Sequence, residues 1–161
     1  MTRSKEKDFN FLLGDWQVQN KRLKACLADS DDWIEFPATL EGSRALLHGF
    51  VIIEQYIAEF DGEPFEGVSI RMYNPETEQW TIYWMDTNRH EMVKQVVGAF
   101  KDETGEFCGY GEELYMGKPV KMRFIWKDIT ATSARWEQAY FDEARGAWET
   151  NWIMEFTRSV E

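Results

Sequence analysis

The chain has 161 residues, of which 43% are hydrophobic, so it has the length and the apolar content of a single domain with a sizeable core. Its formal net charge is −11 at pH 7, and a field of that sign repels phosphate backbones and anionic lipid surfaces. We therefore expect no nucleic acid and no membrane among its partners.

The first structured element is expected to be a short helical turn at residues 8–13, with Asp8 as its N-cap and Gly14 at its end. Beyond it, turn sequences recur at short intervals, and the segments between them lack helical periodicity. These segments predict ten β-strands, at residues 16–27, 33–45, 50–60, 65–73, 80–86, 91–100, 106–115, 119–127, 132–141 and 147–158. Residues 1–7 are expected to be a flexible N-terminus of one domain spanning residues 1–161.

The connections between these strands are typical of consecutive hairpins. Asp61-Gly62 is a two-residue hairpin turn, and residues 74–77 have the sequence of a type I turn. Ten antiparallel strands can form either a two-sheet sandwich or a closed barrel. Closure removes unpaired sheet edges and suits hairpin connections, so the sequence predicts an all-β fold with a closed antiparallel meander barrel. A ten-strand barrel is wider than the eight-strand type that side chains just fill, so some cavity is expected.

The period-two pattern of apolar residues predicts which face of each strand is buried. In the fourth strand Val68, Ile70 and Met72 alternate with Ser69 and Arg71, so the three apolar residues are expected inside. The same rule places a large aromatic set inside the barrel. The set consists of Trp16, Trp80, Trp84, Trp126, Trp136 and Trp152, with Phe124, Tyr140, Met154 and Phe156 beside them.

Gly14-Asp15-Trp16, at the junction of the helical turn and the first strand, resembles the Gly-x-Trp signature of the lipocalin and fatty-acid-binding (calycin) superfamily. That superfamily lays an arginine of the last strand across this tryptophan and bonds it to carbonyls of the N-terminal turn, and Arg158 occupies the matching position. The resemblance therefore implies that Trp16 and Arg158 close the floor of the barrel.

A narrower resemblance rests on two blocks that bracket nearly the whole chain. Residues 9–16 match an early Phe-x-Phe-Leu-x-Gly-x-Trp block, and residues 148–158 match a late Trp-Glu-x-Asn-Trp-x-Met-x-Phe-x-Arg block. Both are similar to an uncharacterised bacterial lipocalin-like family, the DUF1579-like domains. The resemblance implies a fold and leaves the biochemistry open. Nitrobindin-type barrels bind haem through a late histidine, and this chain has none after His90, so we expect no haem of that type. No other cofactor is expected either.

The lumen is where a ligand site is expected. Its aromatic walls would suit a small, largely apolar or aromatic molecule, and the alternative is a core packed solid by the same side chains. The candidate lumen residues are Arg22, Glu54, Tyr56, Trp84, Trp126, Trp136, Gln138, Tyr140 and Trp152.

Polar residues at inward-facing strand positions indicate how a ligand would be oriented. Arg22 continues the face of Trp16 and suggests a polar end to the cavity that grips a carboxylate, whereas a bulge before it would leave Arg22 in solvent. We expect a binding protein rather than an enzyme, with Arg22, Gln138 or Tyr140 orienting the ligand. Two alternatives remain: an isomerase-type barrel enzyme that uses Glu54 or His90, and an interaction module with a solid core.

No catalytic signature or metal site is evident in the sequence. The serines lack a Gly-x-Ser-x-Gly context, and the lone loop histidines His48 and His90 form no metal-binding pattern. Gly109-Tyr110-Gly111 is interpreted as a β-bulge. Residues 1–8 are charged and no long apolar run follows, so neither a leader nor a transmembrane span is expected, and Cys26 and Cys108 suit a reducing cytoplasm. The superfamily's habits suggest a possible homodimer.

Overall fold

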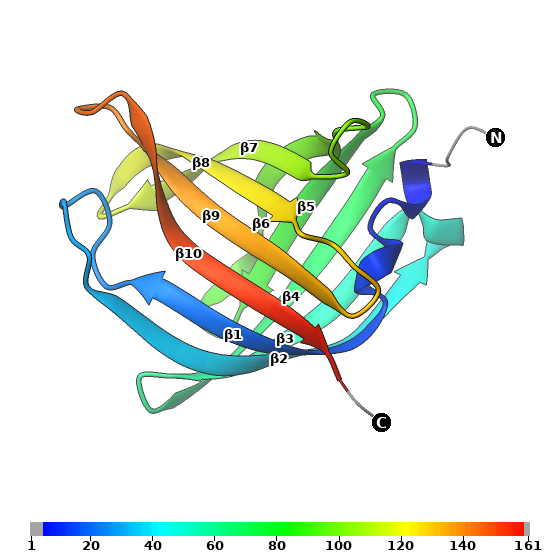
Figure 1. The fold of residues 1–161 in the computed structure, drawn as a ribbon, viewed down its shortest axis with the longest axis horizontal. Coiled ribbons are helices and arrows are strands. Elements are labelled where there is room, and N and C mark those ends of the chain that lie inside the picture. Colours follow the sequence, from blue (N-terminus) through cyan, green and yellow to red (C-terminus); the bar gives the residue numbers. More distant parts are fainter. Residues whose placement is uncertain (1–4, 160–161) are drawn as a thin grey trace.

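Each strand pairs with its neighbour in the sequence, and the first pairs with the last, in the computed structural model, which describes residues 5–159 (Figure 1). The strands are β1 (Gly14–Leu23), β2 (Trp33–Leu46), β3 (Val51–Phe60), β4 (Glu63–Asn74), β5 (Gln79–Asp86), β6 (Arg89–Phe100), β7 (Phe107–Tyr115), β8 (Lys118–Lys127), β9 (Ser133–Asp142) and β10 (Ala147–Arg158). All ten are antiparallel to their neighbours. The closed ten-strand meander confirms the predicted fold class.

Three short 3₁₀-helices complete the fold, η1 (Lys5–Lys7), η2 (Asn10–Leu12) and η3 (Leu47–Gly49). The predicted turn at residues 8–13 is thus reduced to η2, and Phe9 rather than Asp8 occupies its N-cap position without a side-chain hydrogen bond, so the prediction for Asp8 is wrong. Residues 1–4 of the segment expected to be flexible lie outside the described residues. No helix among residues 5–159 is long and apolar enough to cross a membrane.

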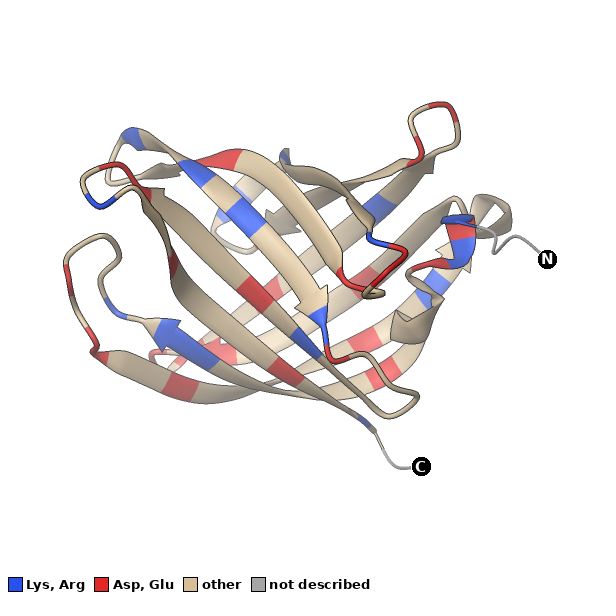
Figure 2. Cartoon of the chain, turned by 45° about the horizontal axis from the view of Figure 1, so that its top comes forward, with Lys and Arg blue, Asp and Glu red and all other residues tan. Residues whose placement is uncertain are grey.

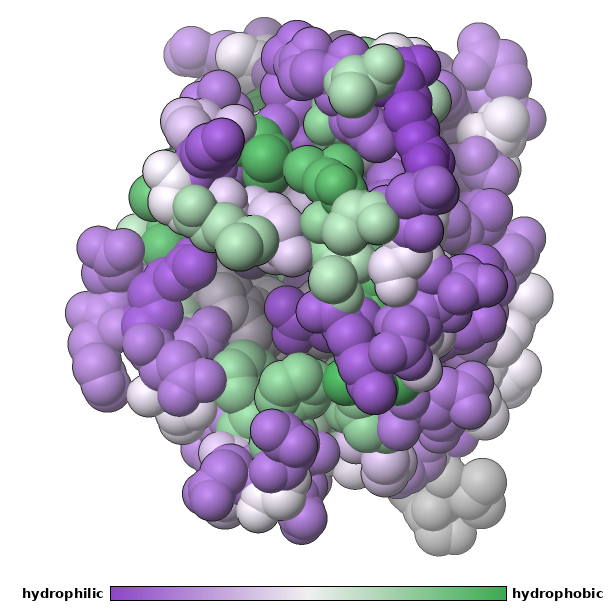
Figure 3. Space-filling model, turned by 90° about the vertical axis from the view of Figure 1, so that its left-hand side faces the viewer, coloured by the Kyte–Doolittle hydropathy of each residue, from purple (hydrophilic) through white to green (hydrophobic). Residues whose placement is uncertain are grey.

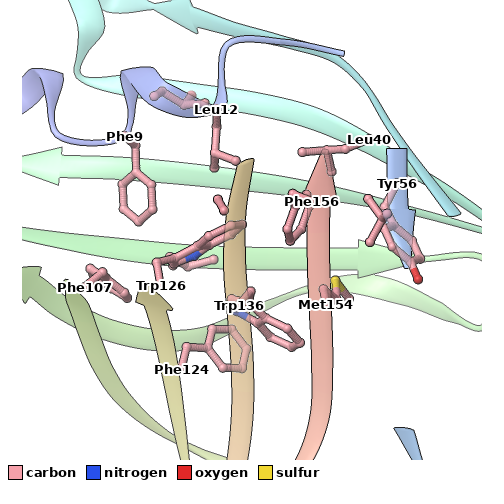
Figure 4. Packing of buried hydrophobic residues seen from close by; sticks show 14 of the residues in the cluster. Phe9, Leu12, Leu40, Tyr56, Phe107, Phe124, Trp126, Trp136, Met154 and Phe156 are labelled. Atoms are coloured by element: carbon pink, nitrogen blue, oxygen red, sulfur yellow. The ribbon is translucent and has the colours of Figure 1, made fainter. Parts of the chain in front are cut away.

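The N-terminal segment closes one end of the barrel with aromatic packing (Figures 1 and 4). Phe9 is fully buried, and its ring centroid lies 5.0 Å from that of Trp80, 4.8 Å from that of Phe100 and 5.2 Å from that of Phe107. Leu12 is also fully buried in this layer. This end of the barrel is therefore a packed floor. Burial of each side chain of this size contributes about 1.5–3 kcal/mol to the stability of the fold.

Arg158 joins the floor to the last strand. Its guanidinium carbon lies 4.1 Å from the centre of the Trp16 ring, and Trp16 and Arg158 are directly opposite each other in the β1–β10 ladder. The guanidinium donates to the carbonyls of Leu13, Phe11 (2.7 Å) and Ala131 (3.0 Å). Phe11 lies in η2, Leu13 follows it, and Ala131 lies in the β8–β9 loop, so one side chain satisfies three backbone carbonyls outside the strands.

The fourth strand is one register step out of phase with the sequence prediction. Ser69 and Arg71 are buried inside the barrel, whereas Val68 and Ile70 lie on the half-buried outer face and Met72 is 45% exposed. The prediction that these three apolar residues point inward is therefore wrong. The reason is the two-residue turn Asp61-Gly62, which pairs Phe60 with Glu63 and so places Ser69 opposite Glu54 and Arg71 opposite Ile52.

The glycines of β7 serve close packing rather than a bulge. β7 pairs with β8 in unbroken register, which contradicts the bulge predicted at residues 109–111. A Cβ atom built on Gly111 would lie 1.7 Å from the carbonyl oxygen of Gln95, and one on Gly98 would lie 2.1 Å from that of Cys108. Only glycine permits β6 and β7 to approach this closely. Their ladder is short, with Val97–Phe100 opposite residues 107–110.

Charged residues are interspersed along the strands and turns (Figure 2). Most of those with partners form ion pairs on the outer surface, such as Arg135 with Glu137 and Glu155. Surface pairs of this kind contribute little to stability.

The Arg158→Met substitution tests the closure contact. It removes the stack on Trp16 and leaves carbonyls without donors, so the free energy of unfolding should fall by about 2–4 kcal/mol in urea denaturation followed by tryptophan fluorescence. Arg135→Met is the matched control on the outer face and should cost less than about 1 kcal/mol. Equal losses for the two variants would contradict the closure role of Arg158.

Candidate ligand-binding cavity

A cavity of about 460 Å³ lies inside the barrel above the aromatic floor. The lumen is therefore not packed solid, which removes the alternative of a filled aromatic core. Figure 3 looks onto the end of the barrel opposite the N-terminal segment, where a recess lies among apolar residues and polar residues surround them. The volume falls in the range of pockets that hold small molecules.

All nine lumen candidates named from the sequence line this cavity. They are Arg22, Glu54, Tyr56, Trp84, Trp126, Trp136, Gln138, Tyr140 and Trp152. Trp126, Trp136 and Tyr56 lie among the packed side chains of Figure 4. Trp16 and Arg158 lie in the floor beneath and do not line the cavity.

Asn20 on β1 organises one wall of the cavity. Its side-chain oxygen accepts hydrogen bonds from the Tyr56 hydroxyl (2.8 Å) and from the Trp152 indole nitrogen (3.0 Å). Its amide nitrogen donates to the carbonyl of Phe36 (3.1 Å). Asn20 is fully buried and uses both ends of its amide, so it fixes the rings of Tyr56 and Trp152.

Arg22 lies two residues further along β1 and points into the cavity. No bulge precedes it on the β10 side, where the register runs unbroken from Trp16 to Arg22, so the alternative that a bulge releases Arg22 to solvent is wrong. Its guanidinium carbon lies 4.3 Å from the centre of the Trp152 ring and 5.5 Å from that of Phe60. The side chain is half-buried.

Glu54 and Arg71 form a buried ion pair lower in the cavity. Their side chains are 1% and 5% exposed, and an Arg71 nitrogen donates to one Glu54 oxygen. The other Glu54 oxygen accepts from the Ser43 hydroxyl (3.3 Å). The Arg71 guanidinium also lies over the rings of Phe9 and Trp126. Both oxygens of Glu54 are therefore engaged by the protein itself.

The two residues named for an isomerase-type enzyme are not brought together. Glu54 lines the cavity as the partner of Arg71, whereas His90 is exposed on β6 and does not line it. Within residues 5–159 no three His, Cys, Asp or Glu side chains are grouped to hold a metal ion.

Polar residues outside the nine lumen candidates surround the mouth. Arg89 pairs with Glu113 across β6 and β7, with 3.4 Å between Nη2 and a carboxylate oxygen. Asp86 accepts from the Trp84 indole (2.6 Å) and from the backbone N–H of Asn88 (2.8 Å). The sequence predicts Arg89 in the loop between residues 86 and 91, a candidate position at the barrel mouth, and the structure begins β6 with it. The period-two pattern of a strand does not predict whether these residues face the cavity, because they lie beside turns.

Gln138 and Tyr140 lie on β9 on the same side of the lumen. The Gln138 amide nitrogen donates to the Asn151 side-chain oxygen (2.9 Å). Burial raises the pKa of the Tyr140 phenol to about 12, with a smaller contribution from Glu113. Its ring packs 5.7 Å from that of Tyr115, whose hydroxyl accepts a hydrogen bond from the backbone N–H of Cys26 (2.9 Å).

The β1–β2 loop, residues 24–32, is held beside the mouth by several contacts. In addition to the Cys26 contact, the backbone N–H of Leu27 donates to a carboxylate oxygen of Glu149 (2.7 Å), and Asp29 pairs with Arg145. These bonds tie the loop to β10 and to the β9–β10 turn, so one side of the entrance has a fixed border.

Comparison with known proteins places the chain in a family and supports its architecture. The model of the family described as "Protein of unknown function (DUF1579)" matches residues 3–158. A solved structure of a redesigned β-barrel is similar with a TM-score of 0.50 and 10% sequence identity, over 94% of each chain. At that identity the likeness concerns the fold alone. A comparison with curated proteins finds no match.

The buried ion pair can be tested with a double-mutant cycle. Arg71→Met leaves Glu54 buried without its partner, so the free energy of unfolding should fall by about 3–5 kcal/mol. Replacing both residues, as Glu54→Leu with Arg71→Met, should restore most of that loss in urea denaturation, because neither charge remains. A double variant as unstable as the single one would contradict this account.

The Tyr140 phenol predicts a loss of stability at alkaline pH. The unfolded chain releases this proton near the ordinary pKa of 10.0, whereas the folded barrel holds it until about pH 12. The free energy of unfolding should therefore fall as the pH rises from about 10 to about 12. The difference between the phenolate absorbance titrations of wild type and Tyr140→Phe gives the pKa of the Tyr140 phenol. A difference curve centred at the ordinary pKa of 10.0 would contradict the prediction.

Proposed function

The chain belongs to the DUF1579 family, and we propose that it is a binding protein whose barrel lumen holds one small, largely apolar or aromatic molecule. The observation that carries this proposal is the cavity of about 460 Å³ with aromatic walls above a closed floor. Rings from five separate strands line it, namely Tyr56, Trp84, Phe124, Trp136 and Trp152. Flat apolar walls of this kind favour flat apolar occupants.

The wall is built before any ligand arrives. Hydrogen bonds through Asn20 fix the rings of Tyr56 and Trp152, and Trp84 is held by its bond to Asp86. A ligand therefore meets ordered side chains and loses little free energy in arranging them. This supports binding rather than catalysis, since the one buried carboxylate of the lower cavity, Glu54, is occupied by Arg71.

We further propose that the barrel is of the lipocalin-like type. The stack of Arg158 on Trp16 and its bonds to the N-terminal carbonyls support that assignment, because they reproduce the arrangement that the sequence resemblance implies. In such a barrel the packed floor closes one end, and a ligand would enter the lumen through the polar mouth at the other.

The proposal predicts that the purified barrel binds N-phenyl-1-naphthylamine, a neutral aromatic probe whose fluorescence rises in apolar surroundings. Ser69 is 7% exposed and lines the cavity, so Ser69→Leu places extra volume in the lumen and should weaken binding about tenfold or more. Titration fluorescence measures the affinity, and native mass spectrometry should show one probe per chain.

Thr81→Leu is the matched control, since Thr81 lies on the outer face of the neighbouring strand β5. It should leave probe affinity unchanged. Circular dichroism establishes that both variants remain folded. Absence of binding to the wild-type protein, or equal affinity for wild type and Ser69→Leu, would overturn the lumenal site.

A further inference from the structure

Of the ionised side chains that line the cavity, one makes neither an ion pair nor a hydrogen bond through its side chain within residues 5–159. Six such residues line it: Arg22, Glu54, Arg71, Asp86, Arg89 and Glu113. Arg71 is paired with Glu54, and Arg89 is paired with Glu113. Asp86 accepts two hydrogen bonds from the protein. Within residues 5–159, Arg22 alone of the three cations has no carboxylate within 4.0 Å and makes no hydrogen bond through its side chain.

The surroundings of Arg22 leave its N–H groups without partners. Trp152 and Phe60 stack against the guanidinium and cover apolar surface, but aromatic faces accept no conventional hydrogen bond. A guanidinium carries five donors in a planar fork that matches the two oxygens of a carboxylate. The Arg22 side chain is half-buried and so has lost part of its hydration, which a bound anion would compensate.

We propose that Arg22 is the anchor for a carboxylate group of the lumenal ligand, with Tyr140 and Gln138 completing the polar contacts and the aromatic walls taking the apolar body. This inference rests on the proposed function and narrows the ligand class to apolar or aromatic monocarboxylates.

The anchor is held in place before binding. Trp152 stacks under Arg22 and is fixed through its indole N–H by Asn20, which also holds Tyr56. The ring of Trp152 beneath Arg22 is therefore held in one orientation. A guanidinium positioned by its faces keeps its donor edge available, so the ligand does not have to order a flexible side chain.

Strand β9 supplies further hydrogen-bond donors for the carboxylate, namely Gln138 and Tyr140. Arg22 pairs with Trp152 in the β1–β10 ladder, and Trp152 pairs with Gln138 in the β10–β9 ladder, so Arg22 and Gln138 share one row across the lumen wall. Tyr140 is the next inward residue of β9. Its hydroxyl makes no hydrogen bond to the protein within residues 5–159, and a phenol is protonated at pH 7, so Tyr140 is a neutral donor.

The charges of the cavity favour a monoanion. One unpaired cation compensates one negative charge, whereas the carboxylates of Asp86 and Glu113 line the same cavity and would repel a second. A phosphate monoester, which carries between one and two negative charges at pH 7, is therefore a poorer occupant than a carboxylate.

A matched pair of probes tests the charge requirement. Biphenyl-4-carboxylate and biphenyl-4-carboxamide have nearly the same shape and differ in charge, and isothermal titration calorimetry gives both affinities. Wild-type protein should bind the carboxylate about 10- to 100-fold more tightly, because a hydrogen bond to a charged group is worth more than a neutral one. Arg22→Met should reduce that preference to within about threefold.

Two comparisons separate a specific anchor from a general effect of charge. Arg44→Met removes an exposed arginine of β2 and should keep the full preference. Arg22→Lys retains the charge but loses the planar fork, and it should retain part of the preference. As a readout that needs no variant, wild-type titrations at pH 7 in buffers of different ionisation enthalpy should show no net proton uptake, since the ligand binds as the anion.

The outcomes distinguish the two proposals. If the barrel binds N-phenyl-1-naphthylamine but takes neither biphenyl probe, or takes both equally, the lumenal site stands and the carboxylate anchor is overturned. A preference that survives Arg22→Met, or uptake of one proton on binding, also overturns the anchor. If none of the three probes binds, the proposed function itself fails.

Discussion

Without the ladder between β1 and β10, the ten strands would form an open sheet with two unpaired edges and no interior. Trp16 and Arg158 meet at one end of that ladder, and Arg22 and Trp152 meet at the other. The floor and the ligand wall are therefore parts of the same strand pair. Because closure fixes the register of both, the stack at the floor also sets the position of the guanidinium at the mouth.

Polar groups inside the closed barrel need hydrogen-bond or ion-pair partners, and the polarity of the interior changes with depth. The floor holds packed rings, the buried Glu54–Arg71 pair lies above it, and the uncompensated Arg22 lies nearer the solvent. A buried pair of this kind is weak evidence for stability, since its desolvation offsets its attraction. Such a pair keeps the lower cavity polar without leaving a free charge there, and the unpaired cation that can attract an anion lies nearer the mouth.

The architecture was predictable because hairpin turns and strand periodicity are local signals. The ten strands, their meander order and the nine lumen candidates follow from them, with strand ends displaced by a few residues, as when β1 ends at Leu23 rather than at residue 27. The phase of β4 was not predictable from its own apolar residues, because the outside of this barrel is also partly apolar. Arg71 was missed for that reason.

The missing signal for Arg71 lay in a neighbouring element. Asp61-Gly62 is a two-residue turn, and with Glu54 assigned to the lumen it requires Ser69 and Arg71 to face inward as well. Mouth residues such as Glu113 and Asp86 carry no comparable signal, because the curvature and tilt of the strands decide which residues near a turn reach the cavity. Pair contacts such as Arg89 with Glu113 depend on that three-dimensional path.

The pairing of the first strand with the last also has a consequence during synthesis. Residues 14–23 leave the ribosome early, but their β10 partner is complete only when residue 158 has been made. Until then β1 has one unpaired edge and the aromatic lumen is open to water. A nascent chain of this kind presents an unpaired strand edge for most of its translation time, and such an edge is a template for pairing with other chains.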